Sequence, residues 1–291
     1  MMKKVAVTGA TGFVGKRFME INRDRFDLLP LSLRWREPAD IDLAGVSSVV
    51  HLAGKAHQME PIEDRIYFDV NYELTRQLAE RAIQQRVKHF IYISSTKVYG
   101  DDIHEVLNEH SPCTPGDAYG GSKWKAEQYL ASVHSNAFKV AVVRPPLVYG
   151  PGVKGNMIKL LQLADKKYPL PFGNSGNSRS MVFVDNLVAL IDTIIDREAH
   201  GVFIGGDSKP VSTDALILLM RHYLSNPKGL LTIPGFIRPV IRKLKPALYT
   251  RLFGSFVVDN SATNERLHFV PPYSTAEGVA EMVKWYKGLN A

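Results

Sequence analysis

Short apolar runs alternate with longer amphipathic stretches along the first half of the chain. The apolar runs, rich in β-branched residues, cover residues 5–8, 28–33, 48–52, 90–94 and 140–144. Between them, residues 71–84 carry apolar side chains at helical spacing, and residues 122–133 form a second such stretch. This alternation is typical of βαβ units, which wind a parallel sheet with helices on its faces. The pattern predicts an α/β fold with a doubly wound parallel sheet.

The pattern changes after Pro145. Proline and glycine cluster in residues 145–155 and 170–176, and prolines interrupt residues 233–246. Strand-like runs return at residues 182–184 and 202–204. We therefore expect one domain over residues 1–150 and a smaller C-terminal region over residues 151–291, with residues 178–205 returning to the sheet of the first domain.

A glycine-rich turn directly follows the first predicted strand. Its glycines, Gly9, Gly12 and Gly15, lead into a predicted helix. In a dinucleotide-binding turn the first glycine tightens the turn, the second lets the backbone approach a pyrophosphate, and the third lets helix and strand pack closely. The strand–turn–helix context favours this reading over an ordinary turn. It predicts a Rossmann domain that binds NAD or NADP through Gly9, Thr11, Gly12, Phe13, Val14 and Gly15.

The end of the second predicted strand bears on the choice of cofactor. An acidic residue about 20 positions beyond the glycines would bind the ribose hydroxyls of NAD, whereas an arginine suits the 2′-phosphate of NADP. The strand ends in Leu33, Arg34, Trp35 and Arg36, without a carboxylate. Arg34, and less directly Arg36, can pair with a phosphate, so NADP is favoured over NAD. The alternative, two solvated arginines in a loop, stays open.

Tyr119 and Lys123 are four residues apart, so on a helix they share one face. A tyrosine is a poor base at neutral pH, and a nearby ammonium group favours its phenolate form. This spacing is common on helical surfaces and means little alone. Ser95, however, follows the fourth predicted strand, at the sheet edge where doubly wound folds bind ligands. The glycine turn, Ser95 and the Tyr119/Lys123 pair together predict a hydride-transfer site.

On these residues the chain resembles an extended short-chain dehydrogenase/reductase of the NAD(P)-dependent nucleotide-sugar epimerase/dehydratase family, and is similar to UDP-glucose 4-epimerases. The matching stretches are residues 8–15, 51–54, 70–71, 93–100, 119–123, 144–152, 179–185 and 259–269. The resemblance implies that Tyr119 transfers a proton, Lys123 lowers the pKa of Tyr119, and Ser95 is a second hydrogen-bonding group. It implies further cofactor contacts from Leu52, Ala53, Gly54, Asn71, Tyr119, Lys123 and Pro145.

The resemblance also implies that the C-terminal region binds a UDP-sugar substrate. Asn156 would contact the diphosphate, Phe172 would lie against uracil, and Arg179 would bind phosphate or ribose oxygens. Phe172 has an equally good alternative role as a core residue. Further substrate contacts are expected from Ser95, Thr96 and, with a less well-defined register, Arg251.

The formal net charge of +7 is concentrated late in the chain. No acidic residue lies between Asp214 and Asp259, whereas the interval contains Arg221, Lys228, Arg238, Arg242, Lys243, Lys245 and Arg251. The default reading is a solvated basic face, followed by steering of a diphosphate substrate and then by weak association with a membrane surface. The sequence lacks the aromatic-rich basic platform that binds single-stranded nucleic acid, so no nucleic-acid partner is expected.

Composition excludes several other classes of protein. Cys113 is the only cysteine, which excludes an intramolecular disulfide and a cysteine-based zinc site, and no metal is expected. The first strand begins too early for a signal peptide, and no apolar run approaches the ~20 residues that a membrane helix needs. We therefore expect a cytoplasmic enzyme. The family resemblance implies a homodimer paired through the helices that carry Asn71 and Tyr119.

Dehydratases of this family carry an Asp-Glu pair directly after the hydroxyl residue of the fourth strand. Here Thr96 and Lys97 take those positions, so the resemblance disfavours dehydration. The first remaining hypothesis is NADPH-dependent reduction at C4 of a UDP-4-keto-6-deoxy-HexNAc for surface polysaccharide. Arg34 favours it, and residues 144–155 resemble bacterial polysaccharide enzymes with that activity.

The second hypothesis is a UDP-glucose or UDP-GlcNAc 4-epimerase, since close relatives of those reductases are commonly grouped with such enzymes. An alternative from a different class is a catalytically inactive protein that binds a cofactor as a sensor. The intact set of Ser95, Tyr119 and Lys123 disfavours that alternative.

Overall fold

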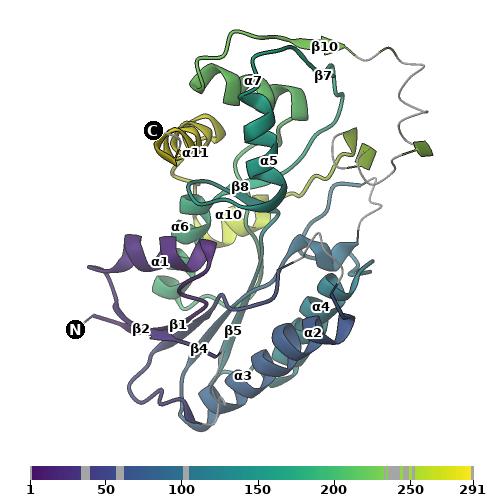
Figure 1. The fold of residues 1–291 in the computed structure, drawn as a ribbon. Helices are drawn as coiled ribbons and strands as arrows, with labels where there is room; N and C mark the ends of the chain where they lie inside the picture. The colour runs from purple at the N-terminus through teal and green to yellow at the C-terminus, as the bar shows by residue number, and fades with distance from the viewer. Residues whose placement is uncertain are drawn as a thin grey trace.

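Six parallel strands form the central sheet of the computed structural model, in the order β2-β1-β3-β4-β5-β9. Figure 1 shows this sheet with α2 (Asp64–Phe68), α3 (Leu74–Gln84) and α4 (Ala118–Val133) along one side. The strands are β1 (Lys4–Thr8), β2 (Asp27–Leu31), β3 (Ser48–His51), β4 (His89–Ile93), β5 (Lys139–Arg144) and β9 (Gly201–Ile204). Because β2 and β3 lie on opposite sides of β1, the crossovers run in two directions, as in a doubly wound fold. The predicted fold class is confirmed.

The structure describes residues 2–33, 40–56, 62–100, 105–232, 234, 243–244, 249–250 and 253–289. Two predicted ligand contacts, Arg34 and Arg251, lie outside the described residues, as does Arg36. Within the described residues, no helix is long and apolar enough to cross a membrane.

The strands alternate their side chains between two apolar cores. Val7 and Ile91 face a core shared with α1 (Phe13–Asn22) and α6 (Val184–Arg197). Ala6 and Phe90 face the core on the other side, shared with α3 (Leu74–Gln84) and α4 (Ala118–Val133). This alternation explains why nearly every strand residue is apolar, because both faces of the sheet are covered.

Of the two strands expected to return to the main sheet, only the second does so. β8 (Met181–Phe183) pairs with β6 (Leu147–Tyr149) in a separate two-stranded sheet, whereas β9 pairs with β5. Pro145 and Pro146 end β5, because a proline has no N–H to donate to a strand ladder. The chain therefore leaves the main sheet there, and α6 leads it back to β9.

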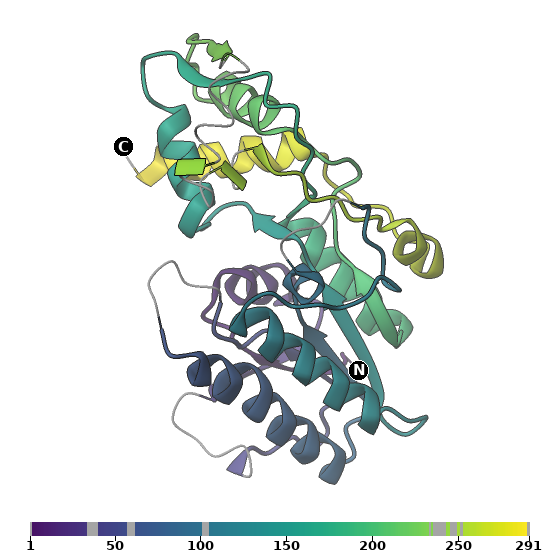
Figure 2. The same cartoon turned by 90° about the vertical axis from the view of Figure 1, so that its right-hand side faces the viewer.

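The remaining C-terminal elements gather at one end of the molecule (Figure 2). They are α5 (Gly155–Ala164), β7 (Leu170–Gly173), α7 (Thr213–Tyr223), β10 (Leu230–Thr232) and α11 (Thr275–Leu289), while α10 (Ser261–Leu267) follows Asp259. Met157, Ile217 and Met282 belong to the apolar core that joins α5, α7 and α11. This core is separate from the two cores of the main sheet.

Two predicted helices begin at other residues than expected. α4 starts at Ala118 rather than at residue 122, because the Asp117 side chain accepts a hydrogen bond from the Gly120 amide at 2.7 Å and caps the helix. The helix predicted from residue 71 consists of α2 (Asp64–Phe68), a π-helical turn (Asp69–Glu73) and α3. Asn71 therefore lies in a π-helical turn, a feature that occurs frequently at functional sites.

Arg221 does not belong to a solvated basic face, as the charge pattern suggested. It is buried in α7, and its guanidinium donates hydrogen bonds to carbonyl oxygens of Ala164, Tyr168 and Gly229, among others. Burial lowers its pKa. This arginine joins two loops of the C-terminal part and is unavailable to a ligand.

A buried ion pair between Glu127 in α4 and Arg144 in β5 joins the helix to the sheet, and its loss should destabilise the fold. Replacing Glu127 by glutamine leaves the buried Arg144, now 2.6 Å from a carboxylate oxygen, without a counter-charge. We expect Glu127→Gln to lower the free energy of unfolding by about 3–5 kcal/mol in urea denaturation. Glu281→Gln, in an exposed pair at 3.9 Å, is the control and should cost less than about 0.5 kcal/mol. Equal losses in both variants would contradict this account.

Candidate active site

The glycine turn after β1 is built by close backbone contacts. Gly9 has φ of +69°, and a Cβ there would lie 2.6 Å from the Ala53 amide nitrogen. A Cβ on Gly15 would lie 2.0 Å from the Gly9 carbonyl oxygen. Gly12 is the N-cap of α1, which has no side-chain cap. The turn thus presents backbone at a helix N-terminus, an arrangement that suits a pyrophosphate.

The other residues of this turn that were predicted to bind the cofactor differ in how far they are buried. Thr11 is exposed, while Phe13 and Val14 are half-buried and pack against the core of the C-terminal part. A Cβ on Gly152 would lie 3.6 Å from the Phe13 ring. Phe13 therefore connects the glycine turn to the loop that follows β6.

Gly54 allows two polar side chains to approach the end of β3. A Cβ at Gly54 would lie 2.9 Å from Asn71 Oδ1 and 3.2 Å from Lys123 Nζ. Asn71 is buried, accepts a hydrogen bond from the Lys55 amide at 2.7 Å and donates to Ser122 Oγ at 3.0 Å. Three predicted cofactor contacts from different parts of the chain thus meet at one edge of the sheet.

Buried His51 connects β1, β3 and the turn that contains Asn71. Its Nδ1 lies 2.6 Å from Thr8 Oγ1 and its Nε2 lies 2.9 Å from Thr75 Oγ1. Thr75 donates its one hydroxyl hydrogen to the Asn71 carbonyl at 2.8 Å, so it accepts from His51 Nε2–H. Nδ1 then accepts from Thr8, which in turn accepts from the Ala53 amide. A neutral His51 satisfies every group, and burial lowers its pKa to about 3, with help from the charge of Lys123.

Ser95 and Tyr119 lie in contact with each other. Ser95 follows β4 and caps the short 3-10 helix η3 (Thr96–Tyr99), and its side chain hydrogen-bonds to that of Tyr119 in the first turn of α4. Burial raises the pKa of Tyr119, whereas the Ser95 hydrogen bond lowers it. The charge of Asp117 and the neighbouring Tyr67 raise it further.

Lys123 lies one helical turn beyond Tyr119 and points into the sheet edge. Its Nζ donates to the Ile93 carbonyl at 2.8 Å and lies 4.7 Å from the centre of the Tyr92 ring. Burial lowers the pKa of Lys123 to about 8, while the charge of Glu127 raises it. At neutral pH the ammonium form therefore still predominates, as the proposed pairing with a phenolate requires.

The predicted substrate residues are less closely grouped. Asn156 is exposed in the first turn of α5, and Thr96 is buried, with its amide donating to the Pro145 carbonyl at 3.1 Å. Phe172 lies in the core of the C-terminal part, in agreement with the alternative role weighed for it. Arg179 is half-buried and donates to the carbonyls of Thr250 and Gly254 at 3.3 and 3.0 Å.

Several residues that shape the site had no role assigned from the sequence. Glu127 lies one turn beyond Lys123, so residues 119, 123 and 127 share one helical face, and this i, i+4 spacing was the available signal. Thr75 and Ser122 become recognisable only through their contacts with His51 and Asn71. Asp117 had a local signal, since aspartate is a preferred N-cap residue.

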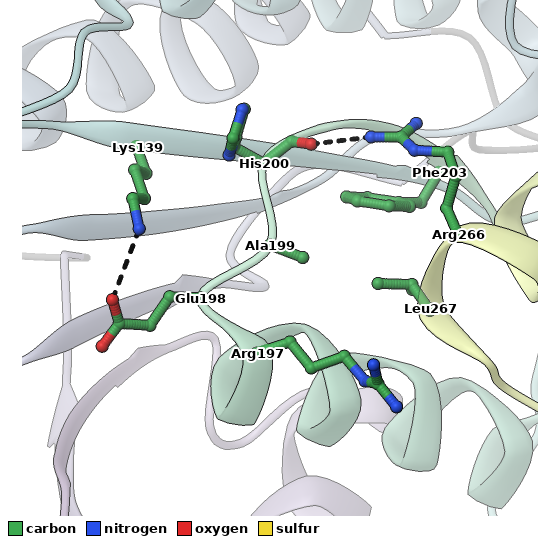
Figure 3. Close-up of a pocket in the computed structure, with 8 residues that line it drawn as sticks. All are labelled: Lys139, Arg197, Glu198, Ala199, His200, Phe203, Arg266 and Leu267. Atoms are coloured by element: carbon green, nitrogen blue, oxygen red, sulfur yellow. Dashed lines mark hydrogen bonds and ion pairs between the residues drawn. The ribbon is translucent and has the colours of Figure 1, made fainter.

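A separate basic hollow lies at the opposite edge of the sheet (Figure 3). It has a volume of about 290 Å³, and its lining residues are Lys139, Arg197, Glu198, Ala199, His200, Phe203, Arg266 and Leu267. Lys139 begins β5 and is paired with Glu198, while Arg266 donates to the His200 carbonyl. Neither Ser95 nor Tyr119, which lie beyond the carboxyl end of β4, is among the residues that line this hollow.

Comparison with known protein families matches residues 32–204 to the family described as "NAD dependent epimerase/dehydratase family". The chain belongs to this family. The protein is therefore an enzyme of nucleotide-sugar chemistry that takes a nicotinamide dinucleotide as its cofactor. The cradle of Gly9, Gly15 and Gly54, where a Cβ has no room, fits such a cofactor, and Asn71 and Lys123 would border it.

Individual relatives align with nearly the whole length of this chain. The UDP-glucose 4-epimerase of Vibrio cholerae is 34% identical over 100% of this chain and 97% of its own. The N-acetyl-alpha-D-glucosaminyl-diphospho-ditrans,octacis-undecaprenol 4-epimerase of Escherichia coli O157:H7 is 27% identical over 98% of this chain and 96% of its own. Among solved structures, the UDP-N-acetylglucosamine 4-epimerase from Methanobrevibacter ruminantium M1 superposes with a TM-score of 0.81 at 20% identity, covering 99% of both chains.

The neutral state of His51 makes a prediction about stability at low pH. Between pH 6.5 and about 3 the unfolded chain binds a proton on this imidazole and the folded chain does not. The free energy of unfolding should therefore fall as pH decreases through this range, by up to about 1.4 kcal/mol per pH unit from this group.

The difference between wild type and His51→Asn, measured by urea denaturation at several pH values, isolates this contribution. We expect a shallower pH dependence in the variant, whereas replacement of the exposed His110 by asparagine should leave the slope unchanged. The same slope in wild type and His51→Asn would show that His51 is not kept neutral.

Proposed function

We propose that this protein is a 4-epimerase of a diphosphate-linked sugar, with a UDP-hexose or UDP-N-acetylhexosamine as the expected substrate. The observation that carries the proposal is the hydrogen bond between Ser95 and Tyr119, one helical turn from the buried Lys123 and beside the glycine cradle. Two relatives aligned over almost the whole chain are named as 4-epimerases, which supports this reaction over others of the family.

Tyr119 is proposed to exchange the proton of the sugar 4-hydroxyl. Its phenolate, hydrogen-bonded by Ser95, would take up this proton as the C4–O bond becomes a carbonyl, and the resulting phenol would return it on re-reduction. The dinucleotide, when bound, supplies the hydride acceptor and donor. The Lys123 ammonium would favour the phenolate form by its opposite charge, against the burial that raises the pKa of Tyr119, and the Ile93 carbonyl holds that ammonium in place.

The residues proposed to contact the substrate in the C-terminal part differ in their exposure and in the partners they already have. Asn156 is exposed at the N-terminus of α5, where backbone amides and the helix dipole favour a diphosphate. Arg179 is a weaker candidate, because its guanidinium already binds carbonyls of its own chain and burial lowers its pKa. The burial of Phe172 in the apolar core does not support stacking on uracil. Arg251 stays a prediction.

Dehydration is disfavoured by the side chains that follow Ser95. Thr96 is buried, and Lys97 forms an ion pair with Asp117 at 3.3 Å, so neither supplies a carboxylic acid or a carboxylate base. Elimination of water needs both functions near the sugar.

A second candidate function is NADPH-dependent reduction of a UDP-4-keto-6-deoxy-HexNAc. It rests on Arg34, which would suit a 2′-phosphate, and on the resemblance of residues 144–155 to such reductases. The same Ser95, Tyr119 and Lys123 would serve this reaction, with Tyr119 donating its proton to the new hydroxyl. The identity of the co-purifying dinucleotide, with or without a 2′-phosphate, tests the Arg34 prediction.

Incubation of the purified enzyme with UDP-sugars tests the proposal directly. We expect interconversion of a C4-epimer pair, followed by chromatography, without net consumption of cofactor. Tyr119→Phe should lose about 10²- to 10⁴-fold in turnover while it still binds the dinucleotide, because only the proton-transferring hydroxyl is removed. Tyr168→Phe, at an exposed position in the loop between α5 and β7, is the matched control and should keep full turnover.

Two outcomes would replace the proposal. Stoichiometric NADPH oxidation with a 4-keto sugar, and no interconversion of epimers, would establish the reductase. Binding of the dinucleotide without turnover of any UDP-sugar or 4-keto sugar, and unchanged biological function in Tyr119→Phe, would establish a binding protein.

A homodimer through the helices that carry Asn71 and Tyr119 stays a prediction. α2, α3 and α4 lie together on one outer face of the sheet (Figure 1). Ile66 and Ile83 on these helices are 38% and 39% exposed, which is compatible with a partner surface.

A further inference from the structure

An ion pair connects the two segments that supply the hydroxyl groups of the site. Lys97 Nζ, in η3, lies 3.3 Å from Oδ2 of Asp117, the N-cap residue of α4. Ser95 lies two residues before Lys97, and Tyr119 lies two residues after Asp117. The pair therefore joins the segments directly beside the Ser95–Tyr119 contact.

Lys97 and Asp117 are each also held by a hydrogen bond within their own segment. The other carboxylate oxygen of Asp117 accepts from the Gly120 amide at 2.7 Å. The Lys97 amide donates to Ser95 Oγ at 3.2 Å. A Cβ on Gly120 would lie 2.6 Å from the Lys97 carbonyl oxygen, so the absence of a side chain lets η3 and α4 approach closely. The position of Lys97 is thus set by packing as well as by charge.

The charges and titratable groups around the Tyr119 phenol come from four elements. η3 with its N-cap supplies Ser95 and Lys97, α4 with its N-cap supplies Asp117 and Lys123, α2 supplies Tyr67 at a ring distance of 6.0 Å, and β4 supplies Tyr92. Asp117 is the carboxylate in this set, and it disfavours ionisation of the phenol. The ammonium group of Lys97, 3.3 Å from the Asp117 carboxylate, opposes this effect of Asp117 on the phenol.

We propose that Lys97 is a positioning residue of the active site, which neutralises Asp117 and holds the N-terminus of α4 so that Tyr119 meets Ser95. This proposal rests on the proposed proton transfer by Tyr119. The lysine occupies the position where dehydratases of the family carry a carboxylate. In this chain the residue at that position thus sets the charge near Tyr119 and has no part in the removal of water.

The sign of the expected effect follows from the charges. Removal of the ammonium in Lys97→Met takes away the positive charge beside Asp117, so the negative charge of Asp117 raises the pKa of Tyr119 further. Removal of the carboxylate charge in Asp117→Asn lowers the pKa, while asparagine still caps the helix. Because both side chains are partly exposed, at 29% and 27%, each shift should be only about 0.5–1 pH unit, or ~3- to 10-fold in the acid dissociation constant.

The decisive experiment measures kcat/KM against pH for wild type, Lys97→Met, Asp117→Asn and the double variant, with saturating cofactor. In the direction that begins with proton removal from the sugar, activity rises with pH as Tyr119 ionises. We expect the rise to move to higher pH in Lys97→Met, to lower pH in Asp117→Asn, and back to within about 0.3 pH unit of wild type in the double variant. Lys139→Met, which breaks a more exposed pair at the amino end of β5, should leave the profile unchanged.

A second readout does not depend on turnover. Tyrosinate absorbance, taken as the difference between each protein and its Tyr119→Phe counterpart, reports ionisation of this one phenol and should show the same opposite shifts. If Tyr119→Phe is fully active, the proposed proton transfer fails, yet the absorbance titration still tests the pairing. If Tyr119 is essential and neither readout shifts in Lys97→Met, the inference about Lys97 alone is overturned.

A change in substrate KM without a shift of either titration would also overturn the proposal, because Lys97 would then act on the substrate. A shift in Lys97→Met that persists unchanged in the double variant would show that Asp117 is not its partner in this effect.

Discussion

The buried pair of Glu127 and Arg144 is the interaction on which the geometry of the site depends. It joins α4 to the end of β5, and Ser94 at the end of β4 also donates to Glu127. The hydrophobic effect is non-directional, so apolar contacts by themselves define the rotation of a helix only through packing. Charged hydrogen bonds in a low-dielectric interior require a defined alignment instead. Because Lys123 and Tyr119 lie one and two turns before Glu127, this alignment also directs them to the strand ends.

A second buried network fixes the opposite wall of the site. His51 connects the ends of β1 and β3 with the π-helical turn of Asn71 through two threonine hydroxyls. Every hydrogen in this chain of contacts has one acceptor when the imidazole is neutral, so the network has a single arrangement. The site is thus bordered by one ionic and one neutral network, both anchored in the sheet. Such preorganisation is what proton transfer between fixed groups requires.

Membership in the NAD dependent epimerase/dehydratase family accounts for the cofactor end of the molecule, whereas the choice of reaction depends on few side chains. Thr96 and Lys97, which follow Ser95, carry no carboxyl group, and Lys97 is paired with Asp117. The proposed epimerisation and the alternative ketone reduction would both use Tyr119 and Lys123. They differ in what the site does with the intermediate ketone and with the dinucleotide.

The sequence by itself determined the elements whose signals are local. The apolar runs predicted the six strands of the main sheet, including β9. The glycines at 9, 12 and 15 predicted the cofactor turn, and the spacing of Tyr119 and Lys123 predicted that they share one helical face. Only the tertiary structure decided which runs pair. β8 leaves the main sheet although its sequence resembles that of a central strand, because the prolines after β5 redirect the chain. It also decided that Phe172 and Arg221 belong to the interior, that His51 is neutral, and that Lys97 lies beside Asp117. These properties depend on contacts between residues distant in sequence, and burial and charge pairing have no local periodicity from which to predict them.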